Sequence, residues 1–329
     1  MIPSFRDTSI RVERSFAYNI VRILRTKDGN LMDLHRLQLL RELKRHGTLA
    51  SVAQSMSYSK STISAQLSQL EKETGVQLLE PSGRRVSLTV QAEILLAHAE
   101  VIFEQVEMAK GEIAASLEEI AGTLRIASFQ TAALGLLPAV LERMEREHPR
   151  LRMEVTELEP ERSLPALLAQ EFDLVLAEEF PEHPQVRPAG LDREDLLLDR
   201  MHLATPRAWG CQTIEDLALR PWVMEPEGTA QRAWAVAVCR SAGFEPDVRF
   251  TATDVLLHAR LVETELAAAL LPDLLWYEGR AKVVLCPLPG DPARRIYTAA
   301  RRGATGQPAV RAFRKGLKEE LLFDKSSEL

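Results

Sequence analysis

The stretch GTLASVAQSMSYSKSTISAQLSQLE, residues 47–71, decides how the N-terminal part of this chain folds. It predicts two short helices joined by a tight polar turn. The second helix places Ile63, Leu67 and Leu70 on one apolar face. Its other face carries small hydroxyl and amide side chains, which suit hydrogen bonds to phosphates and base edges in the DNA major groove. The stretch therefore predicts a DNA-binding helix pair.

The sequence on either side extends this pair into a three-helix unit. A preceding helix is expected over residues 32–46, where leucines recur at helical spacing, and Gly47 ends it. Thr48 is the expected N-cap of the next helix. The third helix is expected to run to about Thr74, where a glycine follows.

A two-stranded wing is expected directly after these helices. Residues 76–89, VQLLEPSGRRVSLT, predict two short strands around a Pro-Ser-Gly turn. Arginines in such a wing are natural ligands of phosphates or of a narrow minor groove. The candidate DNA-binding residues are Ser59, Lys60, Ser61, Thr62, Ser64, Gln66, Arg84 and Arg85. The alternative is that these side chains form an ordinary solvated surface.

Charge is distributed unevenly along the chain. The net charge is −6 overall, but residues 1–90 carry +6 and the remainder carries −12. A basic head on an acidic body is typical of a protein that touches DNA with one end only. We find no long apolar run and no secretion signal, and the three cysteines fit no disulfide or metal pattern. A cytoplasmic protein with no membrane partner and no metal is therefore expected.

A long helix is expected over residues 90–117, without proline and with an apolar seam. A helix of this length cannot bury such a seam alone, so we expect it to pair with a second copy of the chain. The alternative is that the seam packs on the body of its own chain. Residues 1–31 precede all of this as an N-terminal arm or a start-site extension.

From residue 122 onward short apolar strands alternate with helices, which predicts βαβ units and a mainly parallel sheet. One helix is expected from Ala132 to His148 and another from Leu164 to Gln170. A second set of strands and helices follows from Trp222, so we expect two lobes. The expected domains are a winged helix-turn-helix over 32–89, the linker helix over 90–117, and an effector-binding domain over 122–329. Lobe I is expected at about 122–196 and 297–329, and lobe II at about 197–296.

The order of these parts resembles the LysR-type transcriptional regulators, over about residues 32–320. The resemblance is carried by Gly47-Thr48-Leu49, Ala53, Met56, Ser59, Ile63, Ser64, Gln66, Leu67, Leu70 and Glu71 in the head, Leu78-Leu79, Arg84 and Leu88-Thr89 in the wing, Gly122 to Ile126 and Leu136-Leu137-Pro138 after the linker, and Leu261-Val262 with Ala268 to Pro272 near the end. Single pieces are weakly specific, whereas all of them in this order are highly specific.

The resemblance implies a DNA-binding transcriptional regulator of the α/β class with an N-terminal all-α winged helix-turn-helix. Its C-terminal two-lobed α/β module would resemble type 2 periplasmic-binding proteins. It would form a homodimer or homotetramer on promoter DNA. A small effector in the cleft between the lobes would change DNA bending and contact with RNA polymerase. Bending costs a few kcal/mol, and effector binding shifts equilibria by a similar amount.

The chain departs from the family pattern at several places. Lys60 and Ser61 stand where Gln and Pro are frequent, which implies a different base preference. Pro81 replaces a common basic wing residue, and Ala92 replaces a frequent Gly in the linker. Glu263-Thr264-Glu265 stands where a Gly-rich turn is usual, so the local shape of the second lobe is expected to differ.

The candidate effector site follows from the ends of strands. The candidate residues are Ser128, Phe129, Gln130, Thr131, Glu157, Gly228 and Thr229. The corresponding family segment around Ser128 lines the cleft. Hydroxyls and free N–H groups at a helix start suit a carboxylate or phosphate, so a small polar metabolite, an amino acid or organic acid, is expected. The alternatives are ordinary helix capping for the hydroxyls and a surface carboxylate for Glu157.

Catalysis finds little support in the sequence. The seven histidines form no metal-spaced pair, and no phosphate-binding loop or nucleophile elbow is present. No catalytic residue and no cofactor is therefore expected. Two other classes of protein remain as alternatives: a solute-binding or sensor module, and a small-molecule enzyme with an accessory DNA-binding head.

Overall fold

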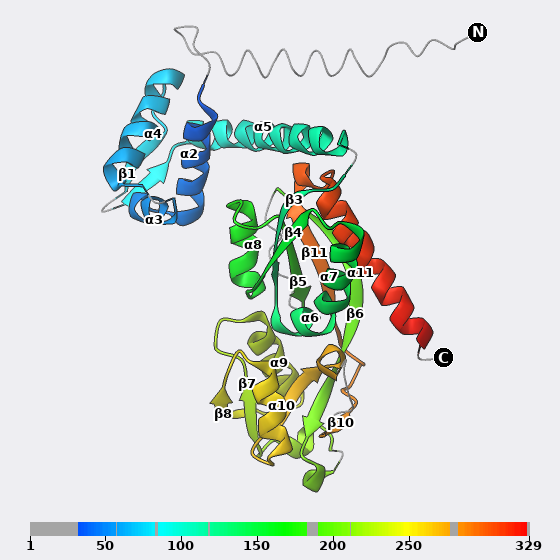
Figure 1. Ribbon diagram of the computed structural model, residues 1–329. Helices are drawn as coiled ribbons and strands as arrows, with labels where there is room; N and C mark the ends of the chain where they lie inside the picture. Colours follow the sequence, from blue (N-terminus) through cyan, green and yellow to red (C-terminus); the bar gives the residue numbers. More distant parts are fainter. Residues whose placement is uncertain are drawn as a thin grey trace, which may run out of the picture. The chain divides into compact units, whose positions relative to one another are not determined.

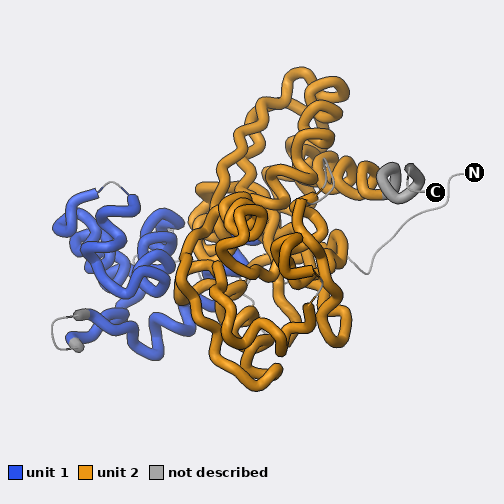
Figure 2. Tube along the Cα trace, turned by 90° about the horizontal axis from the view of Figure 1, so that it is seen from below, with its two compact units in different colours: residues 1–106 blue, residues 107–329 orange. Residues whose placement is uncertain are grey.

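The computed structural model describes residues 32–56, 58–82, 85–117, 119–182, 190–210, 212–276 and 282–327. The expected N-terminal arm, residues 1–31, lies outside the described residues. The chain divides into two compact units, Met1–Val106 and Glu107–Leu329 (Figure 2). The division falls inside one helix, α5, rather than in the loop that follows it.

The first unit is a trihelical head with a β-hairpin (Figure 1). Its helices are α2 Leu34–His46, α3 Leu49–Ser55 and α4 Lys60–Thr74. Gly47 ends α2 at φ +70°, and its N–H donates to the Leu43 carbonyl at 2.9 Å. Thr48 and Ser59 cap the next two helices through their side chains, so the local chemistry of the turns acts as the sequence predicts.

The wing and the linker helix complete this unit. Strands β1 Leu79–Ser82 and β2 Arg85–Leu88 pair antiparallel, and helix α5 runs from Val90 to Ala115. The first half of α5 packs on the head through Ala92, Leu96 and Ala99, which join Ile63 and Leu67 in one apolar core. The start of α5 is thus part of the core of the head.

A mixed seven-stranded sheet dominates the second unit. Its strands are β3 Gly122–Ser128, β4 Leu151–Glu157, β5 Leu174–Glu179, β6 Leu191–Thr205, β9 Ala269–Pro272, β10 Val284–Cys286 and β11 Ala293–Arg301. β3 lies parallel to β4 and β5, whereas β11 pairs antiparallel with both β5 and β6. The expectation of a mainly parallel sheet is therefore wrong, because β11 runs opposite to both of its neighbours, and β9 and β10 run opposite to β6.

Helices cover both faces of the lobe I part of this sheet. They are α6 Gln130–Gly135, α7 Leu137–Glu147, α8 Pro160–Leu168 and α11 Pro308–Ser327. Val140 and Phe313 bring α7 and α11 into one core with β3 and β5. Leu164 and Leu167 of α8 pack on the other face, against Val175. Both cores consist of fully buried aliphatic and aromatic side chains, the main stabilising contribution in such a domain.

Lobe II is built on a smaller parallel pair and on the far ends of the long strands. The pair consists of β7 Pro221–Met224 and β8 Asp247–Thr251, and its helices are α9 Ala230–Ser241 and α10 Val255–Glu263. Short 3-10 turns lie at Arg207–Trp209, Glu215–Leu217, Asp273–Trp276 and Arg302–Ala304. Because β6 carries the pairing of both β11 and β9, it runs from one lobe into the other.

Two expected helices differ in their bounds. The helix expected over 132–148 is two helices, separated at Leu136, because Pro138 lies in the first turn of α7 and has no N–H to continue the earlier helix. The helix expected from Leu164 begins earlier, with Pro160 at its first position. Among the described residues, no helix is long and apolar enough to cross a membrane.

Candidate DNA-reading helix and effector site

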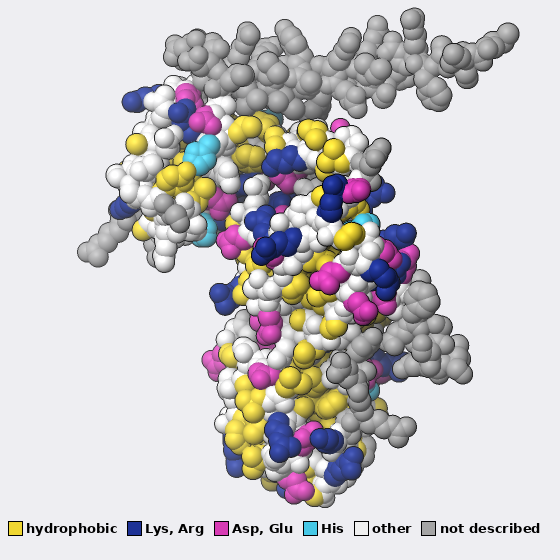
Figure 3. Space-filling model, viewed as in Figure 1, with side chains coloured by type: hydrophobic (Ala, Val, Ile, Leu, Met, Phe, Trp, Pro, Cys, Tyr) yellow, Lys and Arg dark blue, Asp and Glu magenta, His cyan; other side chains and the backbone are white. Residues whose placement is uncertain are grey.

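Helix α4 presents the predicted polar face to solvent. Ile63, Leu67 and Leu70 are buried in the head, and the first turn of the helix is exposed on the opposite side. The exposed candidates are Ser59, Lys60, Ser61, Thr62 and Ser64. In the space-filling view, side chains that are neither charged nor apolar, together with backbone, cover much of this unit (Figure 3). The surface is therefore free to meet a ligand by hydrogen bonding.

The hydroxyls of the first turn are organised by the N-cap. Ser59 Oγ accepts the Thr62 N–H at 3.1 Å and lies 2.8 Å from both the Ser61 and the Thr62 hydroxyl oxygens. Gln66 is half-buried, and its Oε1 accepts a hydrogen bond from Arg36 Nε of α2 at 2.9 Å. The side-chain amide of Gln66 is thus held in place rather than free on the helix surface.

Further residues share the exposed face of α4. Ala65, Ser68 and Gln69 are exposed and follow the first turn at helical spacing, a signal that the sequence already contained. Of the wing candidates, Arg84 lies outside the described residues, and so does the side chain of Arg85. The backbone of Arg85 pairs with Ser82 across the hairpin.

The segment expected to hold the effector lies where lobe I meets lobe II. Ser128 is buried and its hydroxyl donates to the Phe129 carbonyl at 3.1 Å. Gln130 reaches into lobe II: its Nε2 donates to Asp254 Oδ1 at 2.9 Å, and its Oε1 accepts the Val255 N–H at 2.8 Å. The start of α6 is thus tied to the start of α10.

Arg294 of β11 is the centre of this junction, with 4% of its surface exposed. Its guanidinium donates to Asp199 at 2.6 and 2.8 Å and to Glu178 at 2.5 Å. It also donates to the Thr131 hydroxyl at 2.7 Å, and its Cζ lies 5.2 Å from the centre of the Phe129 ring. The buried hydroxyl of Thr131 therefore accepts a hydrogen bond from a cationic side chain of the protein itself.

Three more carboxylates from the two lobes approach one another beside Arg294. Glu159 stands at the N-cap position of α8 without a side-chain capping bond, and Glu161 Oε1 accepts the Ala230 N–H of lobe II at 3.2 Å. Glu225 follows β7 in lobe II and is only 7% exposed. Burial and the neighbouring carboxylates, foremost Glu178, raise the pKa of Glu159 to about 7 and that of Glu225 to about 8. Near neutral pH both carboxyl groups hold protons readily.

The remaining effector candidates lie at the edges of this junction. Glu157 is exposed at the end of β4, paired in register with Ser128. Gly228, at φ +95°, leads into Thr229, whose side chain caps α9 by accepting the Arg232 N–H at 3.2 Å. In this structure the Thr229 hydroxyl thus caps a helix, as the alternative to ligand binding states. The candidates of lobe I and lobe II face one junction, joined by the Glu161–Ala230 contact.

Several residues of the junction were not predicted. Arg294 and Asp199 lie within strands that the sequence pattern did not indicate. Glu225 and Asp254 had no motif around them. Glu178 stands next to another acid, Glu179, in the sequence, but its partner Arg294 is 116 residues away. Only the fold reveals that these charges converge.

Cysteine and metal chemistry find no site in the described part of the chain. Cys239 and Cys286 are buried and form no disulfide, and burial raises the pKa of the Cys239 thiol to about 12. Cys211 lies outside the described residues. No group of three or more His, Cys, Asp or Glu side chains in the described ranges could hold a metal ion.

Comparison with known proteins defines the class. Residues 34–93 match the family described as bacterial regulatory helix-turn-helix protein, lysR family, and residues 117–322 match the LysR substrate binding domain. The chain therefore belongs to the LysR-type transcriptional regulators: it is a DNA-binding transcriptional regulator with an effector-binding domain.

Individual relatives agree with this assignment. The chain is 30% identical over 281 residues to a probable hydrogen peroxide-inducible genes activator of Mycobacterium avium, covering 84% of this chain and 83% of that protein. It is 28% identical to the dual regulator OxyR of Escherichia coli K12, covering 83% and 90% of the two chains. A full-length OxyR variant of Pseudomonas aeruginosa has the same fold, with a TM-score of 0.59 at 18% identity, covering 88% and 95%.

The raised pKa values of the junction carboxyls predict a specific pH dependence. A carboxyl whose pKa in the folded state exceeds the ordinary glutamate pKa of 4.5 binds more protons folded than unfolded, so stability falls as pH rises from about 4.5 to about 8. In the double variant Glu159→Gln, Glu225→Gln, stability should fall less steeply with rising pH than in the parent. It should therefore gain stability relative to the parent at the alkaline end of that range.

Denaturant unfolding of the second unit across this pH range measures the effect. Glu227→Gln is the matched control, because Glu227 is exposed two residues from Glu225. Equal pH slopes for the parent and the double variant would contradict the prediction.

Proposed function

We propose that this regulator reads promoter DNA with the exposed face of α4 and that a small polar metabolite between the lobes of the second unit controls that binding. The capped first turn of α4, which presents a lysine and several hydroxyls to solvent, is the observation that carries the proposal. We place its action in the cytoplasm, with DNA and RNA polymerase as partners. We propose no catalytic residue.

The roles on DNA follow from side-chain chemistry. Thr62, Ser64 and Gln66 suit base edges or thymine methyl groups, whereas Lys60 suits a guanine or a phosphate. Gln66 would have to exchange its bond with Arg36, or read DNA through its Nε2 while Oε1 stays bound. We assign the arginines of the wing, Arg84 and Arg85, to the phosphate backbone.

The charges at the lobe junction favour one kind of metabolite. Arg294 is committed to Glu178, Asp199 and Thr131, whereas the Glu159 and Glu225 carboxyls are cramped among other acids. A ligand amino group would relieve this repulsion, and a plain organic acid would add to it. Among the expected ligands we therefore favour an amino acid, with its carboxylate toward the segment Ser128 to Thr131.

Direct sensing of peroxide by a thiolate finds less support, although the Mycobacterium avium relative is named a probable hydrogen peroxide-inducible genes activator. The reactive form of cysteine is the thiolate. Cys239 is buried with a pKa of about 12, and Cys286 is buried as well. Both thiols are therefore poorly suited to this role.

We propose that α5 pairs with its counterpart in a second copy. Ile94, Val101 and Met108 are exposed at a spacing of seven residues along this helix. A seven-residue apolar repeat is the pattern of helix pairing in a coiled coil. Whether dimers combine further into a tetramer depends on other surfaces.

Lys60→Ala should weaken binding to the DNA just upstream of the protein's own reading frame. Loss of a phosphate or guanine contact should lower affinity by about tenfold and reduce the salt slope by about one. Fluorescence anisotropy titrations at several salt concentrations measure both quantities. Lys72→Ala, an exposed lysine in the last turn of the same helix, is the matched control. Unchanged affinity and salt slope for Lys60→Ala would remove this residue from the interface.

A thermal-shift screen of amino acids and organic acids tests the effector site. We expect at least one amino acid to raise the unfolding temperature, since a ligand of the folded state stabilises it by mass action. Ser128→Ala and Thr131→Ala should each reduce the shift, whereas Ser241→Ala, at the far end of α9, should keep it. If both lobe I variants retained the full shift, the effector would bind elsewhere.

Ile94→Glu combined with Val101→Glu should separate the dimer, because each places a charge in the proposed apolar seam. Size-exclusion chromatography with light scattering should then give the monomer mass. Ile94→Leu keeps the seam apolar and should remain dimeric. A dimer mass for the charged variant would show that the seam packs elsewhere.

A further inference from the structure

The end of the linker helix belongs physically to the effector domain. From Glu107 onward α5 falls in the second unit. A Cβ added at Gly111 would lie 3.3 Å from the Gln307 nitrogen, so the helix passes very close to the segment before α11. Glu107 is 6% exposed and accepts hydrogen bonds from Lys110 at 3.0 Å and from Gln307 at 3.4 Å.

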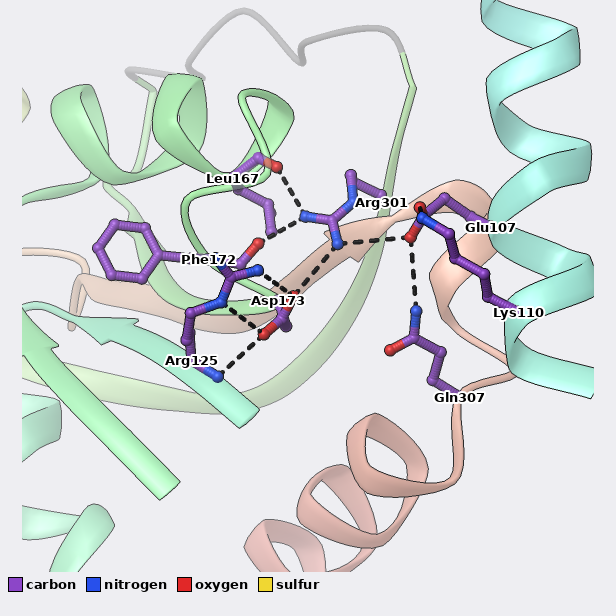
Figure 4. Close-up of polar contacts among 8 residues, drawn as sticks. All are labelled: Glu107, Lys110, Arg125, Leu167, Phe172, Asp173, Arg301 and Gln307. Atoms are coloured by element: carbon purple, nitrogen blue, oxygen red, sulfur yellow. Dashed lines mark hydrogen bonds and ion pairs between the residues drawn. The ribbon is translucent and has the colours of Figure 1, made fainter. Parts of the chain in front are cut away.

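Arg301 connects this helix end to lobe I (Figure 4). It is 8% exposed, and its Nη2 lies 3.5 Å from Glu107 Oε2 and 3.3 Å from Asp173 Oδ1. Its Nη1 donates to the carbonyls of Leu167 at 2.9 Å and Phe172 at 2.5 Å. One guanidinium therefore holds the linker helix, the end of α8 and the start of β5 together.

A second arginine fixes the position of Asp173. Arg125 of β3 donates to both Asp173 oxygens, at 3.0 and 3.1 Å, in the fork geometry that gives a strong charge-assisted pair. The Asp173 carboxylate also accepts the Arg125 backbone N–H at 3.0 Å. Because Asp173 cannot turn away, Arg301 is itself held in one orientation.

The other end of α8 lies at the lobe junction. Glu161 in its first turn accepts the Ala230 N–H of lobe II, and Glu159 stands at its N-cap position within the group of carboxylates. The helix has nine residues, and Pro165 within it donates no backbone hydrogen bond. Leu164 and Leu167 pack into one core on either side of this proline, so displacement of the first turn displaces the last turn as well. The last turn presents the Leu167 carbonyl to Arg301.

We propose that α8 and Arg301 form a mechanical link that passes changes at the lobe junction to Glu107 and thus to the linker helix. This inference rests on the proposed control by an effector between the lobes and names the route of that control. Arg301 and Glu107 act as positioning residues: they touch neither DNA nor effector. The site where motion enters the linker helix is the turn around Glu107, not the loop after Ala115.

A double-mutant cycle with hydrogen–deuterium exchange of the full chain tests the link without an identified effector. Glu161→Ala perturbs the lobe junction, and Glu107→Ala cuts the link at the helix. The readout is amide exchange in the peptide covering residues 107–115. Glu112→Ala, an exposed acid on the same helix, is the matched control for Glu107→Ala.

Glu107→Ala alone should raise exchange of this peptide by about tenfold, the scale expected when a hydrogen bond to a charged group is lost from a local opening equilibrium. Glu161→Ala should change its exchange by about threefold or more in the parent and in Glu112→Ala, but not in Glu107→Ala, because coupled residues are non-additive. Gly111→Leu, which pushes the helix end off the Gln307 backbone, should likewise abolish the response and serves if Glu107→Ala folds poorly.

Additive effects of Glu161→Ala and Glu107→Ala on this exchange would overturn the proposal. Unchanged exchange of the peptide covering residues 107–115 in Glu161→Ala would overturn it as well. A uniform rise of exchange throughout β3, β5 and β11 in both Glu107→Ala and Gly111→Leu would also overturn it, since these contacts would then only stabilise the domain. The result is independent of DNA binding by α4. Failure of the Lys60→Ala titration would reject the proposed DNA-reading face and leave this cycle interpretable.

Discussion

The buried guanidinium of Arg294 is the constraint on which the effector domain depends. Taking a charge out of water costs several kcal/mol, so the group is tolerated only because Glu178 and Asp199 neutralise it and hydrogen bonds satisfy its donors. These partners come from β5, β6 and α6, and Asp199 also accepts the Leu274 N–H. Removing Arg294 would leave the two buried acids without a counter-charge, a loss of about 3–5 kcal/mol. The elements around the lobe junction therefore cannot shift independently.

The carboxylates outside this arrangement behave differently. The hydrogen bonds of Arg294 go to Glu178, Asp199 and Thr131 rather than to Glu159 or Glu225, and neighbouring acids raise the pKa of Glu159 and Glu225. When these acids are ionised, their mutual repulsion disfavours close approach of the two lobes. Protonation of the acids, or a bound ligand with a positive charge, removes that repulsion. A guanidinium paired with two acids and a group of crowded acids thus lie side by side at the lobe junction.

The sequence predicted the head in detail and the effector domain in outline. Local signals sufficed for α2 to α4, because Gly47, Thr48 and Ser59 cap these helices through hydrogen bonds to residues only three or four positions away. The strands β6 and β11 escaped notice because their partners lie far along the chain, and their charged residues broke the apolar pattern. Arg294 and Arg301 could not be predicted for the same reason: their roles arise from contacts more than ninety residues away.

Helix α5 is where the two units share one element. Its first half contributes Ala92, Leu96 and Ala99 to the core of the head, and its last turns are held by Arg301 and Gln307. Backbone hydrogen bonding joins the turns of a helix, so a displacement at Glu107 moves the last turns of α5 together. The buried pair of Glu107 and Arg301 is consequently better placed to carry a signal than a salt bridge on the surface, whose coupling water and salt would largely screen.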